Sequence, residues 1–444
     1  MQPQPDVLAS LRRDLADWRQ WAARVVVLAA AVTAGLVVVG FTWLSAEALA
    51  AFEAIRRTHA WFPLLWTPAV TALLVWLTVR FFPGASGSGI PQVMAALAPS
   101  VTPSQRGLFV SLRLSVAKAL MTATGLLAGL AIGREGPSVQ IAAGVLQHVE
   151  RWLPRRTHVT HQGLLVAGGA AGIAAAFNAP LAGVMFAIEE LSRKLEQRSS
   201  GLIVTAIVLS GVVAISAFGN AAYFGVLRVP ALGWDYLLPG ALAIVGCGLL
   251  GGFLSRLLVA SVVGGGDRIS AWRRLHPVWF AAACGLAIAV IGLVSGGSSF
   301  GSGYDYTRRL VDGHIDVPLL YVTLRIIATW LAVWSGVPGG IFAPMLAIGA
   351  GVGADVALLV SIDQTSAPLI AIGMTALLAA VTQAPLTAFI IVMEMVDGHA
   401  MVLSLMAAAL GASLVSRWIA RPLYEALAEA QLRRAETVSP TVPA

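Results

Sequence analysis

Three short motifs place glycines at breaks between the apolar stretches of this chain. They are "GSGIP" at 87–91, "GREGP" at 133–137 and "GGIFAP" at 339–344. Glycine lets the backbone approach a ligand closely, and proline suits the first turn of a helix, where no N–H group is needed. A helix that begins there presents free N–H groups and the positive end of its dipole. A single motif of this kind can be a tight turn, but three together predict a site for an anion.

Glu135 adds a titratable group to the second motif. It follows the apolar run 114–132, in which Lys118 is the one charged residue. A carboxylate is itself an anion, so at a helix N-terminus it can occupy an anion site when ionised and leave it when protonated. The alternative is a surface ion pair with Arg134, but adjacent residues on a helix do not face each other. We therefore expect Glu135 to act as a gate.

The composition predicts the elements that position these residues. Hydrophobic types make up 58% of the 444 residues and charged types 11%, whereas a soluble domain carries about 25% charged residues. The 45 glycines and 22 prolines indicate close helix packing and broken helices. The net charge of +7 is scattered in short clusters such as Arg155-Arg156 and Arg193-Lys194, which is typical of membrane anchoring rather than nucleic-acid binding. The chain is expected to be an all-α polytopic membrane protein.

Apolar stretches long enough to cross a bilayer recur along the chain. They lie near residues 25–55, 61–82, 107–132, 163–190, 201–218, 236–263, 276–295, 316–336, 341–360, 366–396 and 401–420. Residues 1–24 are predicted to form an amphipathic helix on the membrane surface, because charged and apolar residues alternate there at helical spacing. Residues 421–444 are predicted to form a final short helix and a tail.

The chain also repeats itself. "NAPLAGVMFAIEE" at 178–190 is similar to "QAPLTAFIIVMEM" at 383–395, and "GPSVQIAAG" at 136–144 aligns with "APMLAIGAG" at 343–351 at nearly the same separation. These matches predict two homologous membrane halves, residues 25–220 and 221–420. Such repeats commonly pack with inverted topology and hold the substrate between them at the midplane of the membrane.

Taken with "RPLY" at 421–424, these motifs resemble the CLC family of chloride channels and proton/chloride antiporters, in its bacterial form without CBS domains. The resemblance covers nearly the whole chain. It implies an inverted repeat of broken and re-entrant helices, and a homodimer with one anion pathway per subunit. It also implies a place in the bacterial inner membrane with both termini in the cytoplasm.

The resemblance implies a central anion held by the hydroxyls of Ser88 and Tyr424 and by the N–H groups of Ile341 and Phe342. A bare anion in lipid has a very large desolvation cost. Dipoles without full charges can replace its water and still release it, as fast turnover requires. The remaining candidate anion-binding residues come from the glycine motifs: Gly87, Gly133, Arg134 and Gly136.

The resemblance makes Glu135 the external gate and proton acceptor and Glu190 the internal proton-transfer residue. The alternative for Glu190 is a solvated charge at a helix end. Glu189, like Glu394 in the second half, is expected to support packing or a dimer contact.

Lys118 is expected to shape the electrostatic potential of the pathway, because an intramembrane lysine is costly and normally has a partner. Gln92 and Met94 stand where better-known bacterial members carry acids. Lys118 then has Glu190 or the anion itself as alternative partners.

The sequence favours a proton-coupled chloride antiporter, and the alternative is a passive gated anion channel of the same fold. Ser88 resembles chloride-preferring members, so chloride is the expected substrate, with nitrate and bromide also carried. An intramembrane enzyme would need a nucleophile–base pair or a metal cluster, and the sequence contains no such motif. We expect no cofactor, no metal and no nucleic-acid partner. The expected partners are chloride, protons, membrane lipid and a second copy of the chain.

Overall fold

The computed structural model describes residues 18–154, 157, 159–192, 200–219, 222–227, 234–314, 318, 320–360 and 366–438. These residues contain many helices and no strand, only two isolated bridges, which pair Gly87 with Pro338 and Gly133 with Gly340. This confirms the predicted all-α class. The surface helix predicted for residues 1–24 lies mostly outside the described residues, as do the basic pairs at 155–156 and 193–194.

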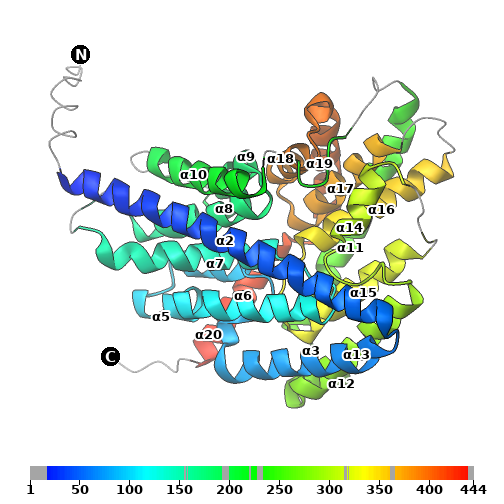
Figure 1. Ribbon diagram of the computed structural model, residues 1–444, viewed down its shortest axis with the longest axis horizontal. Helices are drawn as coiled ribbons and strands as arrows, with labels where there is room; N and C mark the ends of the chain where they lie inside the picture. Colours follow the sequence, from blue (N-terminus) through cyan, green and yellow to red (C-terminus); the bar gives the residue numbers. More distant parts are fainter. Residues whose placement is uncertain are drawn as a thin grey trace.

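The helices follow one another along the chain with short connections (Figure 1). Those of the first part are α2 (Trp18–Thr58), α3 (Phe62–Phe81), α4 (Ile90–Leu97), α5 (Pro103–Phe109), α6 (Leu112–Leu127), α7 (Glu135–Val149), α8 (His161–Ala176), α9 (Pro180–Phe186) and α10 (Ser200–Phe218). Those of the second part are α11 (Leu237–Val263), α12 (Arg268–Leu275), α13 (Pro277–Val294), α14 (Tyr304–Val311), α15 (Tyr321–Ser335), α16 (Phe342–Leu359), α17 (Ala367–Thr382), α18 (Pro385–Met395), α19 (Val402–Arg417) and α20 (Leu423–Val438).

Eight helices within the described residues are long and apolar enough to cross a membrane. Others are shorter: α7 has 15 residues and α18 has 11. At 1.5 Å per residue, a helix of 15 residues is about 22 Å long, less than the roughly 30 Å of a hydrocarbon core. The protein is therefore a multi-pass membrane protein with broken and re-entrant helices.

Two of the long apolar segments of the sequence are each divided in the structure. The segment 163–190 breaks between α8 and α9, and 366–396 breaks between α17 and α18. At these breaks Asn178 (φ 55°) and Gln383 (φ 59°) adopt the left-handed conformation. Each stands two residues before a proline that opens the next helix, and the residue before a proline disfavours the α conformation. The local sequence thus ends one helix and starts another.

The two halves of the chain meet through a reciprocal pair of hydrogen bonds. The N–H of Gly133 donates to the oxygen of Gly340 at 2.7 Å, and the N–H of Gly340 donates to the oxygen of Gly133 at 2.7 Å. The repeat alignment makes these two glycines equivalent, so the two halves contact each other here through equivalent residues. Equivalent helices also occur in the same order: α7, α8 and α9 correspond to α16, α17 and α18. The proposed boundaries at 220 and 420 remain predictions.

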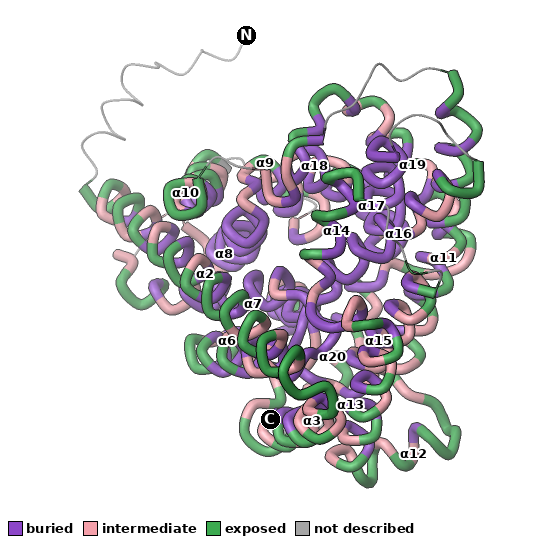
Figure 2. Tube along the Cα trace, turned by 45° about the vertical axis from the view of Figure 1, so that its right-hand side comes forward, coloured by how far each residue is buried: buried purple, intermediate pink, exposed green. Residues whose placement is uncertain are grey.

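The most deeply buried helices pack in pairs within each half, α7 with α8 and α16 with α17. Every residue of α17 is buried, and Figure 2 shows α7, α8, α16 and α17 mostly buried while α2, α3 and α10 expose one face. Small residues allow this packing. A Cβ on Gly373 of α17 would lie 2.2 Å from the carbonyl oxygen of Gly349 on α16. Short helices can therefore end inside the protein instead of in lipid.

Candidate functional site

The three glycine motifs meet at one place in the structure. Besides the Gly133–Gly340 pair, the N–H of Gly339 donates to the oxygen of Gly87 at 3.0 Å. Three helices begin at this junction: α4 at Ile90, α7 at Glu135 and α16 at Phe342. The first N–H groups of a helix have no partner inside the helix. The positive ends of these three helices therefore converge at the junction.

Two buried hydroxyls stand at the junction. The hydroxyls of Ser88 and Tyr424 face each other, yet neither oxygen has a partner with good hydrogen-bond geometry among the described residues. The ring of Phe342 stacks on Tyr424, with a centroid distance of 5.7 Å and an interplanar angle of 28°. A Cβ on Gly136 would lie 2.2 Å from the Ser88 oxygen, so glycine keeps this space open. Unpaired O–H donors beside helix N-termini suit a desolvated anion.

We predict that Ser88→Ala and Tyr424→Phe each weaken anion binding at the junction. Each change removes one O–H donor, and a hydrogen bond to a charged group contributes about 1.5–3 kcal/mol, so each dissociation constant should rise by about ten- to a hundredfold. Isothermal titration of the purified protein with chloride measures this. Thr42→Ala is a control, because the Thr42 hydroxyl is also buried without a partner but belongs to α2. Unchanged chloride affinity in both site variants would contradict the assignment.

Glu135 is fully buried as the first residue of α7. Neither carboxylate oxygen completes a hydrogen bond of good geometry, although the backbone N–H groups of Ala343 and of Glu135 itself approach the carboxylate. The side chain lies against the backbone of its own motif, since a Cβ on Gly133 would be 2.3 Å from Oε2. The carboxylate therefore lies at the adjoining N-termini of α7 and α16, as a bound anion would.

Arg134 does not form a simple surface ion pair with Glu135. Its guanidinium donates to the hydroxyl of Tyr223 at 2.8 Å and to the carbonyl oxygen of Thr42 at 3.2 Å. The Tyr223 ring in turn contacts Tyr304 edge to face, with centroids 4.9 Å apart. The structure thus places the Arg134 side chain near Glu135 and bonds it to Tyr223 and to the backbone of Thr42.

Lys118 is completely buried on α6. Its ammonium group donates to the carbonyl oxygens of Ala85 at 2.7 Å and Gly87 at 2.5 Å. The sequence offered Glu190 or the anion as partners of Lys118, whereas these two hydrogen bonds go to backbone oxygens. Lys118 therefore holds the backbone that leads into Ser88 and places a positive charge behind it.

Gln92 has a structural role that was not expected from the sequence. Its Oε1 accepts from the N–H of Gly89 at 3.0 Å, and its Nε2 donates to the carbonyl oxygen of Ser86. A glutamine three residues after an N-cap is the second half of a capping box, so this contact had a readable sequence signal. Gln92 fixes the turn on both sides of Ser88.

Glu189 and Glu394 cap each other's helices across the repeat. Glu189 accepts from the N–H groups of Leu386 at 3.1 Å and Thr387 at 2.7 Å. Glu394 accepts from those of Leu181 at 3.2 Å and Ala182 at 2.7 Å. Each carboxylate thus neutralises the positive end of a short helix of the other half, and α9 lies beside α18 (Figure 1). This accounts for both residues as packing groups.

Removing either carboxylate should destabilise the protein. Glu189→Ala or Glu394→Ala leaves one part-buried and one exposed N–H group without an acceptor, and an unsatisfied buried group costs about 1–3 kcal/mol. We expect a lower midpoint for thermal unfolding in detergent in each variant. Glu429→Ala, which removes an exposed carboxylate at 3.6 Å from Arg433, should leave the midpoint almost unchanged. Equal midpoints in all three variants would refute the capping function.

Glu190 lies on a π-helical turn, Ala187–Leu191, that follows α9. The negative charges of Glu190 and Glu135 both act on the Tyr424 hydroxyl. Glu190 also lines a cavity of about 410 Å³ together with Glu189 and Glu425. Glu425 was missed by the sequence analysis, although it directly follows Tyr424 in the chain. The structure therefore places one carboxylate at the junction of the motifs and three others along a separate cavity.

No group of three His, Cys, Asp or Glu side chains that could hold a metal ion occurs in the described part of the chain. The chemistry that these residues offer is anion binding by dipoles and proton binding by carboxylates.

Comparison with known proteins places this arrangement in a family. A sequence profile described as "Voltage gated chloride channel" matches residues 70–417. The chain is 33% identical over 442 residues to the H(+)/Cl(-) exchange transporter ClcA of Klebsiella pneumoniae (strain 342), with 93% of this chain and 90% of that protein covered. The chain belongs to the CLC family. CLC proteins are transport proteins, so this chain is a membrane transport protein and not an enzyme.

Solved CLC structures share its fold. A slow cyanobacterial Cl-/H+ antiporter superposes with a TM-score of 0.78 at 26% identity, covering 93% of this chain and 98% of that one. A CLC-type fluoride/proton antiporter superposes with a TM-score of 0.74 at 20% identity, covering 91% of this chain and 97% of that one. At this lower identity the likeness concerns the fold alone.

Proposed function

We propose that this CLC protein exchanges chloride for protons across a membrane. Two of the relatives named above, the ClcA protein and the cyanobacterial antiporter, are described as exchangers of chloride and protons. The observation that carries the proposal is the position of Glu135. Its buried carboxylate lies at the same convergence of helix N-termini as Ser88 and Tyr424. The same site can therefore hold either a chloride ion or the carboxylate of Glu135.

Competition for that site supplies the coupling. When Glu135 is ionised, its carboxylate occupies the dipoles of α7 and α16 and excludes chloride. When it binds a proton, it loses the charge that these dipoles attract, and chloride can take its place. Proton binding and chloride binding are then linked at one position, so each ion affects the affinity for the other.

Glu190 is the proposed internal proton station. Its carboxylate lines a cavity large enough for several water molecules and lies in electrostatic range of Tyr424. Protons can therefore reach Glu190 by a route that differs from the chloride route past Ser88. Lys118 and Arg134 contribute positive potential along the anion route, while the N–H groups of Ile341 and Phe342 complete the central site.

The apolar residues exposed along α9 and α18 are compatible with a dimer in a membrane. The α9–α18 surface exposes Leu181, Ile188 and Leu386, and exposed apolar side chains of this kind suit either lipid or a second copy of the chain. We propose a homodimer that uses this surface, in a bacterial inner membrane and with cytoplasmic termini. Chloride is the proposed principal anion, because Ser88 at the central site resembles the residue of chloride-preferring family members.

Flux in liposomes tests the proposal. Vesicles loaded with chloride and diluted into a low-chloride medium should take up protons as chloride leaves, so the pH outside should rise without any initial pH gradient. A protonophore should remove the effect. Chloride efflux without proton uptake would identify a passive channel instead.

A further inference from the structure

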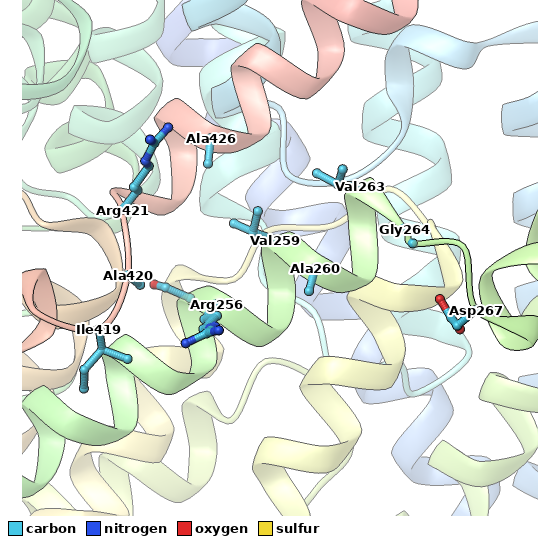
Figure 3. A pocket seen from close by; sticks show the side chains of 12 residues that line it. Arg256, Val259, Ala260, Val263, Gly264, Asp267, Ile419, Ala420, Arg421 and Ala426 are labelled. Carbon is cyan, nitrogen blue, oxygen red and sulfur yellow. The ribbon is translucent and has the colours of Figure 1, made fainter.

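A surface cavity at the end of α11 combines apolar walls with two arginines. Its volume is about 520 Å³, which is within the size range of small-molecule binding sites. Figure 3 shows Arg256, Val259 and Val263 along α11, and it shows Ala420 and Arg421 on the segment that connects α19 to α20. None of the residues assigned to the central anion site lines this cavity. The cavity is therefore distinct from the central anion site.

The cavity lies where two membrane helices end together. Both α11 and α19 are long and apolar enough to cross a membrane. A Cβ on Gly248 would lie 2.8 Å from that of Val415, and one on Gly252 would lie 2.9 Å from that of Ile419. The two helices thus run side by side in the same direction. Trp418, directly after α19, is 80% exposed, and exposed tryptophans are typical of the membrane–water interface. The cavity therefore lies at the depth of the lipid headgroups.

Arg256 is the one charged residue of α11. It lies on the exposed face of the helix between Phe253 and Ala260, which are also exposed. A cation among apolar side chains in a membrane span is costly and normally has a partner. Arg256 precedes the last residue of α11, Val263, by about 10 Å along the axis. It is therefore too far from the C-terminus to interact with the helix dipole, whose influence is confined to the last turn.

Arg421 also occupies an unfavourable place for a cation. It lies just before Leu423, the residue that begins α20, and the positive end of a helix dipole disfavours a positive charge there. Within the part of the chain that the structure describes, neither Arg421 nor Arg256 forms a hydrogen bond or an ion pair. Two guanidinium groups without a counter-charge from the described protein residues therefore line one cavity.

Asp267 is the one acid among the described residues that line the cavity. Its carboxylate caps α12, because it accepts from the N–H of Ser270 at 3.0 Å. Figure 3 shows Asp267 at the opposite end of the cavity from Arg421. The end that holds the arginines is therefore positively charged. Guanidinium groups bind phosphate oxygens through paired N–H donors, so this end is complementary to a phosphate group.

We propose that this cavity binds an anionic membrane phospholipid, with its phosphate at Arg256 and Arg421 and its acyl chains along α11. Leu249 and Phe253 continue the exposed face of α11 away from Arg256 toward the membrane interior, and they offer apolar surface to the chains. A soluble anion gains nothing from this surface, which favours a lipid as the occupant. The lipid supplies the counter-charge that Arg256 lacks, and it neutralises the cation at the start of α20, the helix that carries Tyr424. The proposal does not depend on which ions the protein transports.

The test is a lipid titration of the purified full chain in neutral detergent, followed by native mass spectrometry. Dioleoylphosphatidylglycerol is compared with dioleoylphosphatidylcholine, which has the same chains and no net charge. The wild type should bind the anionic lipid at least about tenfold more tightly, because each guanidinium contributes charge-assisted hydrogen bonds. The double variant Arg256→Gln/Arg421→Gln should lose this preference. Inorganic phosphate at millimolar concentration should not displace the anionic lipid from the wild type.

Two further variants separate a specific site from general charge. Arg417→Gln/Arg433→Gln removes the same total charge from residues that do not line the cavity, so it should keep the preference for the anionic lipid. Arg256→Lys/Arg421→Lys keeps both charges in the cavity and should retain most of the preference. The proposal is overturned if the wild type binds the two lipids equally, if the glutamine variant of the cavity still prefers the anionic lipid, or if the control variant loses as much. Displacement of the lipid by inorganic phosphate would identify a soluble anion as the occupant and overturn it as well.

Discussion

Replacing Glu135 by glutamine is expected to abolish proton transport while chloride still crosses the membrane. The amide has nearly the shape of the protonated carboxyl group, but it cannot bind or release a proton near neutral pH. It also carries no charge that would hold it at the N-termini of α7 and α16. Chloride should therefore find the site open. Proton uptake driven by a chloride gradient should fall to the level of protein-free liposomes, because no titratable group remains at the gate.

Simultaneous recording of pH and chloride in one liposome suspension measures this effect. Glu150→Gln is a suitable control, because Glu150 follows the opposite end of the same helix and its carboxylate contacts His161 on the surface. This control should keep both fluxes. A Glu135→Gln protein that still drives protons against their gradient would show that another group is the gate.

Replacing Glu190 by glutamine is expected to produce the second large effect. Proton transport should drop about ten- to a hundredfold, within the range by which a positioned proton-transfer group contributes. Chloride binding at Ser88 and Tyr424 should remain close to that of the wild type, because Glu190 does not belong to the converging helix N-termini. The measurement pairs proton flux in liposomes with chloride titration of the same preparation.

The neighbouring residue provides the matched control. Glu189 differs from Glu190 by one position on the same turn, but its carboxylate caps α18 through Leu386 and Thr387. Glu189→Gln should therefore lower thermal stability and preserve the ratio of protons to chloride. If Glu190→Gln leaves that ratio unchanged, or if Glu189→Gln destroys it, the two residues have been assigned the wrong functions.

The sequence was informative wherever local chemistry decides the structure. The helix starts at Ile90, Glu135 and Phe342 follow from glycine and proline, whose backbone preferences act within a few residues. The repeat pointed to a meeting of the two halves, and the Gly133–Gly340 pair lies at that meeting. The capping by Gln92 also had a local signal, because a glutamine three residues after an N-cap completes a capping box.

Contacts between distant parts of the chain were not accessible in the same way. Lys118 bonds to the carbonyl oxygens of Ala85 and Gly87, and every residue type offers such an oxygen, so composition cannot indicate the partner. The capping of α18 by Glu189 joins residues 197 and 198 positions apart. Such contacts are set by tertiary packing, which short sequence patterns do not encode.

The most direct test of the proposed exchange is whether a chloride gradient alone moves protons against their gradient through the unmodified protein. In liposomes clamped near zero voltage by potassium and valinomycin, with equal pH on both sides, outward chloride flow should drive protons inward until a pH difference builds up. We expect this proton uptake in the wild type and its loss in Glu135→Gln. Chloride outflow with no proton movement in the wild type would contradict the exchange of the two ions at one site.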